Sequence, residues 1–230
     1  MTRLAEFGYR EIETYGYKEG KIFGMAFTEF AKLCKDLGLK IVSGHYGMDI
    51  VRNGWESAVA DAKAIGQEYM VVPWLDETDR SLQAIKGVCE EMNKAGEVCN
   101  KYGIRMGYHN HDFEFTETDG KILYDVMLTE LDPKYVGQEM DLYWVIYAGH
   151  DPLKYFEKYP GRFEQWHVKD MDKKDRKRNT DVGTGTIDFK AIFARAKQSG
   201  MKHFYIEQEY FKGSPIDSVK AGIENLKKIV

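Results

Sequence analysis

Apolar and polar positions follow a repeating cycle along this chain of 230 residues. Short segments that are apolar, or that alternate between apolar and polar residues as residues 9–15 do, are separated by longer segments whose apolar residues recur every three or four positions, and a glycine closes most of these longer segments. Short apolar runs are typical of buried strands, whereas the longer spacing is typical of amphipathic helices. The pattern predicts seven strands, at residues 9–15, 40–45, 69–74, 103–109, 136–141, 163–170 and 203–209.

The segments between these runs predict the helices. They cover residues 25–37, 55–65, 79–102, 122–131, a short helix starting at 151, 189–198 and 216–230, and residues 2–7 have the pattern of a helix end. Strands that alternate with helices imply a parallel sheet with helices outside it. Seven or eight such repeats in this length favour an α/β fold of the closed (β/α)8-type, a TIM barrel, over an open sheet. We expect a single domain over residues 1–230, because no linker interrupts the pattern.

Histidines and acidic residues gather where the predicted strands end. These residues are His45, His109, His111, Asp141, His167, Asp170, Glu207 and Glu209. In a parallel barrel all of these strand ends lie at one mouth, which is where such folds build their sites. His109 and His111 are expected to face the same way, because alternate side chains of a strand share a face.

Four of these side chains form a candidate set of metal ligands: His109, Asp141, His167 and Glu207. Unpaired charges at one rim would repel one another, so a bound cation is the simpler account of the set. Mixed nitrogen and oxygen ligands suit Mn, Zn, Fe or Co, and Mg less well. Taken singly, Asp141 could instead cap a helix, His167 could be a hydrogen-bonded core histidine, and Glu207 could be a salt-bridge partner.

Composition narrows the class of protein further. The net charge of -4 argues against a nucleic-acid surface, and no run of 18 apolar residues could form a membrane span. Cys34, Cys89 and Cys99 show no ligand spacing, so we expect reduced thiols and a cytoplasmic location. A removed signal peptide ahead of this chain would instead give a secreted or periplasmic protein. The sequence leaves a homo-oligomer open.

Several short motifs, in this order and spacing, resemble those of the xylose isomerase-like sugar phosphate isomerase and epimerase superfamily. The motifs are Tyr108-His109-Asn110-His111, Met140-Asp141-Leu142, His167-Val168-Lys169-Asp170, the segment 183–189 and Ile206-Glu207-Gln208-Glu209. This superfamily of AP endonuclease family 2-like TIM barrels includes ketose 3-epimerases, hydroxypyruvate isomerase, inosose dehydratase and, more distantly, endonuclease IV. The resemblance covers nearly the whole chain from Leu4 onward.

The resemblance implies one divalent metal held by Asp141, His167, Glu207 and a fourth residue. At that fourth position, where the epimerases carry a Glu, this chain has His109, so a symmetric exchange of protons between two glutamates is in doubt. The Tyr-His-Asn-His pattern is similar to the inosose dehydratase branch. Trp74 and Trp144 stand where endonuclease IV has additional metal-binding histidines, which argues against a nuclease. The superfamily also has a first strand before the segment that opens this chain, so we expect a barrel truncated at its N-terminus, with seven recognisable strands.

The leading functional hypothesis is an isomerase or epimerase that acts on a small sugar or sugar derivative. A metal would bind adjacent carbonyl and hydroxyl oxygens and acidify the carbon between them, with Glu207 as the general base and His109 or His111 as the partner acid. Candidates for contacts with the substrate are His45, Trp74, Glu114, Trp144, Lys169, Asp170 and Glu209.

Two other hypotheses remain. A lyase that dehydrates a keto-inositol or cleaves a 3-keto-glycoside would use the same enolate chemistry and then expel a leaving group. A barrel that binds sugar without catalysis would follow from loss of the first strand.

Overall fold

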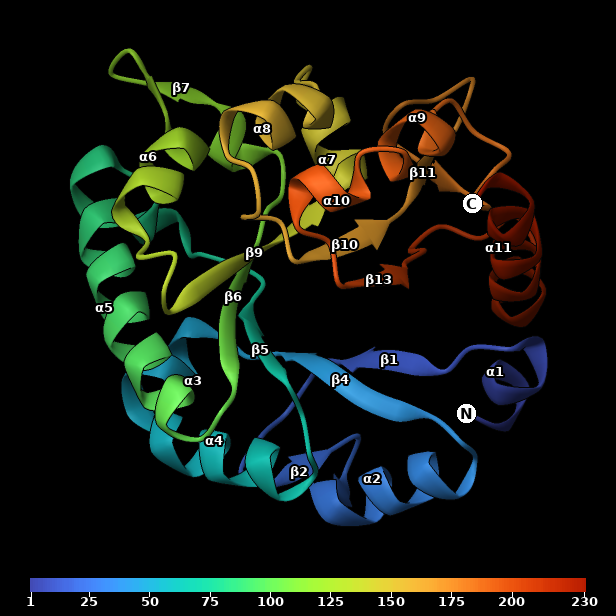
Figure 1. Ribbon diagram of the computed structural model, residues 1–230, viewed down its shortest axis with the longest axis horizontal. Coiled ribbons are helices and arrows are strands. Elements are labelled where there is room, and N and C mark those ends of the chain that lie inside the picture. The colour runs from blue at the N-terminus through green and yellow to red at the C-terminus, as the bar shows by residue number, and fades with distance from the viewer. The chain divides into compact units, whose positions relative to one another are not determined.

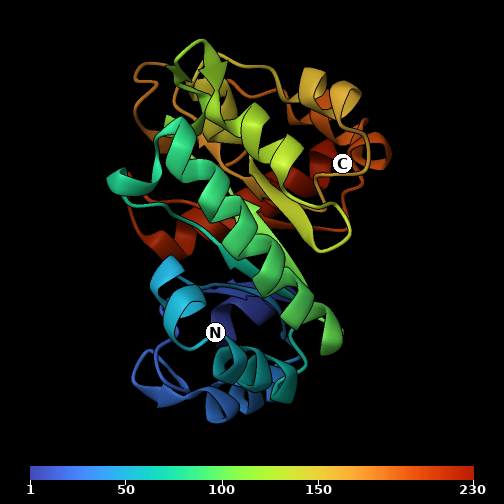
Figure 2. The ribbon, with the colours of Figure 1, turned by 90° about the vertical axis from the view of Figure 1, so that its left-hand side faces the viewer.

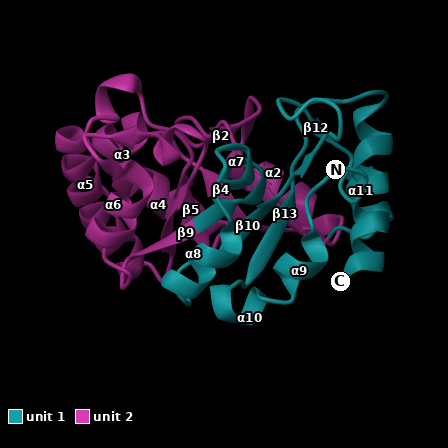
Figure 3. Ribbon diagram, turned by 90° about the horizontal axis from the view of Figure 1, so that it is seen from above, with its two compact units in different colours: residues 1–9, 139–230 teal, residues 10–138 magenta.

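The computed structural model describes residues 1–230 and falls into two compact units (Figure 3). One unit comprises residues 10–138, and the other comprises residues 1–9 together with 139–230. All seven strands expected from the sequence are present, each close to its predicted position. None of the helices combines the length and the apolar character needed to cross a lipid bilayer.

The unit of residues 10–138 is built on four parallel strands in the order β1-β4-β5-β6. Their bounds are β1 Glu11–Thr14, β4 Lys40–His45, β5 Tyr69–Val72 and β6 Arg105–His109 (Figure 1). Every residue of β5 is buried, as its continuous apolar run requires. Two short antiparallel pairs, β2 Lys21–Ile22 with β3 Met25–Ala26 and β7 Glu117–Thr118 with β8 Lys121–Ile122, lie in the connections.

Helices follow the strands of this unit. They are α2 Phe27–Asp36, α3 Met48–Asn53, α4 Trp55–Ala64, α5 Leu82–Lys101 and α6 Leu123–Glu130, with single 3-10 turns η1 Glu77–Asp79 and η2 Phe113–Phe115. The long helix α5 packs against β6 and α6 (Figure 2). It begins at Leu82 rather than at residue 79, because the Ser81 hydroxyl accepts the Ala84 N–H and caps the first turn.

The other unit contains the parallel strands β9-β10-β13 in that order. Their bounds are β9 Val136–Asp141, whose first three residues belong to the unit of residues 10–138, β10 Gln165–Val168 and β13 His203–Ile206. The register places Asp141 beside His167 and His167 beside Tyr205. Paired residues of parallel strands point to the same face, so the sheet gathers polar side chains on one side.

The helices of this unit are α1 Thr2–Phe7, α7 Leu142–Tyr147, α8 Pro152–Lys158, α9 Phe189–Phe193, α10 Ala196–Ser199 and α11 Pro215–Ile229. Helix α1 packs on α11, where the Tyr9 hydroxyl donates to the Val219 carbonyl at 2.8 Å. The Asp151 side chain caps α8, and Pro152 occupies its first turn.

Two further predicted elements differ clearly from the structure. The strand expected at 163–170 ends at Val168, and a hairpin of β11 Asp170–Met171 and β12 Asn179–Thr180 follows it. The helix expected at 189–198 is two short helices, because the chain leaves helical geometry at Arg195. The sequence analysis did not predict α3 and α7, since six residues are too few to show a helical period.

Candidate metal centre

Three candidate ligands come together in the unit that contains β9, β10 and β13. Asp141 ends β9, His167 lies on β10 and Glu207 directly follows β13, and their ligand atoms all lie within 4.8 Å of one another. Asp141 and His167 are buried, whereas the side chain of Glu207 is 31% exposed. The grouping follows from neighbouring parallel strands that end at the same edge of the sheet.

The two carboxylate oxygens of Asp141 have different partners. Its Oδ1 accepts the backbone N–H groups of Tyr143 at 2.8 Å and Trp144 at 3.1 Å, which caps α7. Its Oδ2 lies 3.8 Å from Nζ of Lys169. Burial raises the pKa of Asp141, while the Lys169 ammonium opposes that rise. The helix cap considered from the sequence and a ligand role are therefore compatible in one side chain.

A carboxylate lies beside each nitrogen of the His167 ring. Nδ1 is 2.8 Å from Oε2 of Glu207, and Nε2 is 3.3 Å from Oε2 of Glu139. Glu139 is fully buried on β9, two residues before Asp141 and on the same face of the strand. Glu139 is not among the predicted site residues, although the alternation of faces along β9 could have indicated it.

Lys169 brings a buried positive charge into the same cluster. Its Nζ lies 2.9 Å from Glu209 Oε1 and 3.5 Å from Glu207 Oε2, and 4.9 Å from the ring centre of Trp144. Burial alone would lower the pKa of Lys169, but Asp141 and the two glutamates raise it above its ordinary value. Lys169 therefore stays charged and offsets part of the negative charge of the cluster.

A second group of predicted site residues lies within the unit of residues 10–138. The rings of His45 and His109 are 5.2 Å apart, and those of His109 and His111 are 4.9 Å apart. The short distance between His109 and His111 agrees with their expected position on one face. Nε2 of His45 lies 2.9 Å from a carboxylate oxygen of Glu13 at the end of β1. That His109 supplies a fourth ligand stays a prediction.

Glu114, three residues after His111, is fully buried. Its oxygens accept the Tyr108 hydroxyl at 2.6 Å and the backbone N–H of His111 at 2.9 Å. Burial raises the pKa of Glu114 to about 7, and these two donors oppose the rise. These contacts hold the turn that carries His111 in place. That Glu114 also contacts the substrate stays a prediction.

Trp74 follows β5 and is 47% exposed. Its ring contacts His111 at 5.0 Å between ring centres, and the Arg80 guanidinium lies 4.5 Å from the centre of the indole. Arg80 also lies 3.7 Å from the ring centre of Phe113 and donates twice to the Leu75 carbonyl. Arg80 is not among the predicted site residues, because its position depends on a loop and not on a strand.

Asp170 has a structural task that the sequence did not reveal. Its two oxygens accept backbone N–H groups from Met171, Gly183, Gly185 and Ile187, with distances of 2.8–3.2 Å. These contacts close the loop between β11 and α9. A contact between Asp170 and substrate stays a prediction, and the geometry supports a loop-fixing role.

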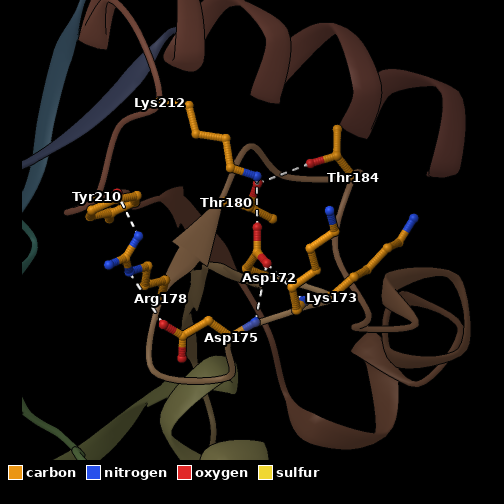
Figure 4. A pocket seen from close by; sticks show the side chains of 9 residues that line it. Asp172, Lys173, Asp175, Arg178, Thr180, Thr184, Tyr210 and Lys212 are labelled. Atoms are coloured by element: carbon orange, nitrogen blue, oxygen red, sulfur yellow. Dashed lines mark hydrogen bonds and ion pairs between the residues drawn. The ribbon is translucent and has the colours of Figure 1, made fainter.

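A charged pocket of about 460 Å³ lies in the unit of residues 1–9 and 139–230 (Figure 4). It is lined by Asp172, Lys173, Lys174, Asp175, Arg178, Thr180, Thr184, Tyr210 and Lys212. Lys212 pairs with Asp172 at 2.6 Å, and Arg178 donates to the Tyr210 hydroxyl at 2.7 Å. None of the predicted site residues lines it, and much of its charge is neutralised internally.

The donor set of the three-residue cluster fits a divalent cation. It offers one imidazole and two carboxylates, gathered at the end of neighbouring strands, with one member partly open to solvent. Three protein ligands with open positions are the usual arrangement of a catalytic metal. Zn, Mn, Fe and Co accept such mixed ligands.

A family model described as the xylose isomerase-like TIM barrel matches residues 1–229. The chain belongs to this family. Membership confirms the expected α/β TIM-barrel fold class and the resemblance read from the short motifs. It also places the chain in a superfamily of enzymes.

Relatives within the family carry two kinds of name. A sugar phosphate isomerase/epimerase from Parabacteroides distasonis is similar with a TM-score of 0.88 and 30% identity, over 98% of this chain and 86% of that one. An inosose dehydratase from Lacticaseibacillus casei is 26% identical over 55% of this chain and 48% of its own length. The chain thus spans about half the length of that curated relative. A structure of the IOLI protein with a bound zinc atom shares the fold, with a TM-score of 0.78 at 15% identity over 99% of this chain and 90% of that one.

Proposed function

We propose that this protein is a divalent-metal-dependent isomerase or epimerase that acts on a small sugar or sugar derivative through an enolate-type intermediate. The observation that carries the proposal is the convergence of Asp141, His167 and Glu207 within 4.8 Å. The names of the relatives, sugar phosphate isomerase/epimerase and inosose dehydratase, support a sugar-like substrate.

Asp141, His167 and Glu207 would hold the metal, with His109 as the predicted fourth ligand. When bound, the metal would act as a Lewis acid that polarises a carbonyl and a neighbouring hydroxyl of the substrate. Mn, Zn, Fe or Co fits the donor set, and the zinc found in the IOLI protein makes zinc a useful first choice for tests.

Glu207 is suited to take a proton from the carbon next to the carbonyl. It is the most accessible member of the cluster, so its carboxylate can reach a substrate while Asp141 and His167 stay buried. Lys169, charged and buried beside it, would stabilise negative charge that develops on the substrate oxygen. His109 or His111 would return the proton.

The remaining candidates would bind the substrate. His45, Glu209 and Lys169 would contact its hydroxyl groups, and Trp74 and Trp144 would stack on its apolar face. Glu114 and Asp170 would act mainly through the turns that they hold, as their contacts with backbone N–H groups suggest.

A lyase is the second candidate, and one observation favours it. The curated relative reported above is an inosose dehydratase, an enzyme that by its name removes water. In this alternative Glu207 takes the same proton, and an imidazole of His109 or His111 protonates the departing hydroxyl instead of returning the proton to carbon.

Proton exchange with deuterated water tests the step common to both candidates. The metal-loaded protein is incubated with panels of ketohexoses, keto-inositols and 3-keto-glycosides, and NMR follows deuterium at carbon and the products. We expect exchange in wild type and its loss in Glu207→Gln. An epimer or isomer supports the first candidate, and an unsaturated or cleaved product supports the second. Failure of wild type to exchange with any of these compounds would contradict both, and a barrel that only binds sugar would then remain.

A further inference from the structure

Glu139 is a buried acid that the proposed chemistry does not use. It lies on β9 with no exposed surface, beside Gln165 of β10 in the register. Burial of a carboxylate costs free energy unless hydrogen-bonding partners replace water. Its position two residues before Asp141 directs it to the same face of the sheet as the candidate ligands.

The contact of Glu139 is with the ring nitrogen that faces away from Glu207. Its Oε2 lies 3.3 Å from Nε2 of His167, and the other ring nitrogen, Nδ1, lies 2.8 Å from Glu207. A carboxylate that accepts the N–H of one nitrogen fixes the ring and leaves the lone pair of the other nitrogen for a metal.

We propose that Glu139 is a positioning residue, which holds the His167 imidazole so that Nδ1 is presented to the metal together with Asp141 and Glu207. The inference rests on the proposed metal-dependent function. It assigns Glu139 a role through His167 and not through direct contact with metal or substrate. In this arrangement Nε2 carries the proton and donates it to the Glu139 carboxylate.

Two variants of Glu139 distinguish loss of the hydrogen-bond acceptor for His167 from loss of the negative charge. Glu139→Ala removes the acceptor, whereas Glu139→Gln keeps a side-chain oxygen that can still accept the Nε2 proton. The matched control is Glu164→Gln, which removes one buried negative charge that pairs with Lys202 at 2.8 Å from the adjacent strand. Circular dichroism and thermal unfolding of each metal-free protein establish that it folds.

Zinc affinity is measured by competition with a chromogenic chelator, on the full chain stripped of metal. We expect Glu139→Ala to bind zinc about 10- to 100-fold more weakly, the range typical of partners that orient a ligand. Glu139→Gln should recover most of this loss, and Glu164→Gln should bind like wild type. Equal affinity of wild type and Glu139→Ala would overturn the proposal.

The tautomer of His167 gives a readout independent of zinc. Nitrogen-15 NMR of the zinc-loaded and metal-free proteins should show a proton on Nε2 of His167 in wild type and Glu139→Gln, whereas in metal-free Glu139→Ala the proton should move to Nδ1, which faces Glu207 at 2.8 Å. Unchanged signals in Glu139→Ala would contradict a positioning role. If Glu139→Gln and Glu139→Ala both lose as much affinity as Asp141→Ala, Glu139 is a ligand and the proposal is wrong. If wild type binds no zinc, the proposed function fails, whereas the NMR signals still decide whether Glu139 orients the ring.

Discussion

Oε2 of Glu207 lies 2.8 Å from Nδ1 of His167, so the most exposed carboxylate of the cluster faces a buried imidazole. His167 lies on β10, which pairs directly with β13, and Glu207 is the first residue after β13, so the end of the sheet sets the contact. Site residues on strands are held more precisely than residues on loops. A cation bound here would replace this contact with two metal–ligand bonds.

Metal binding should stabilise the folded protein. Zinc at about 100 times its dissociation constant should add about 2.7 kcal/mol to the free energy of unfolding, and a chelator should reverse the gain. Thermal unfolding with and without zinc and chelator measures this effect. In Asp141→Asn the gain should fall sharply, although asparagine caps α7 as well as aspartate does. An unchanged gain in this variant would exclude Asp141 as a ligand.

Lys169→Met should destabilise the metal-free protein by about 3–5 kcal/mol, because it leaves Asp141, Glu207 and Glu209 without their buried counter-charge. Bound zinc should recover part of the loss by supplying positive charge. Chemical denaturation measures both values. Lys202→Met is the control, since Lys202 is exposed and its pair with Glu164 should contribute at most about 1 kcal/mol. Similar losses in both variants would show that the carboxylate cluster does not depend on Lys169.

Glu114 should make stability depend on pH. Burial raises its pKa from 4.5 to about 7, so the folded protein holds this proton more tightly than the unfolded chain. The contribution is complete below about pH 4.5 and is lost as the pH rises through about 7, a change of about 3 kcal/mol. Denaturation of wild type and Glu114→Gln across this range should show the variant gaining relative stability as pH rises. The exposed Glu117→Gln should show no such gain, and a constant difference between wild type and Glu114→Gln would count against the assignment.

Gly185→Ala should loosen the loop between β11 and α9. A Cβ at this position would collide with the Met171 carbonyl and with the Asp170 carboxylate that holds the loop. We expect a loss of about 1–3 kcal/mol, as is usual for an overpacked site, measured by chemical denaturation. Gly213→Ala meets no atom within 4 Å and serves as the control. Equal stability of the two variants would mean that the loop adapts without cost.

The sequence predicted the seven strands well, because each is a short apolar or alternating segment between the longer helical patterns. It also predicted that Asp141, His167 and Glu207 meet, since ends of neighbouring parallel strands lie together. The contacts of Arg80 and Asp170 could not be predicted in this way. They depend on loops whose path is decided by stacking and by backbone hydrogen bonds, which leave no period in the sequence.

Glu139 shows a different limit. The alternation of faces along β9 places Glu139 on the same face as Asp141. The sequence does not indicate, however, that the Glu139 carboxylate contacts the His167 ring. The distinction between a ligand and a residue that orients a ligand needs atomic distances. The short helix α7 was missed because its six residues are too few to show a helical period, although Asp141 was a candidate helix cap.

The two oxygens of Asp141 tie the start of α7 to the ligand cluster through one side chain. If the proposed site binds a cation, a replacement at this position would have to satisfy both the helix end and that cation. Glutamate, which keeps the charge but reaches further, would change both together. Asp141→Asn would therefore weaken the proposed metal site and keep the helix cap, whereas Asp141→Glu would disturb the helix cap and the site together.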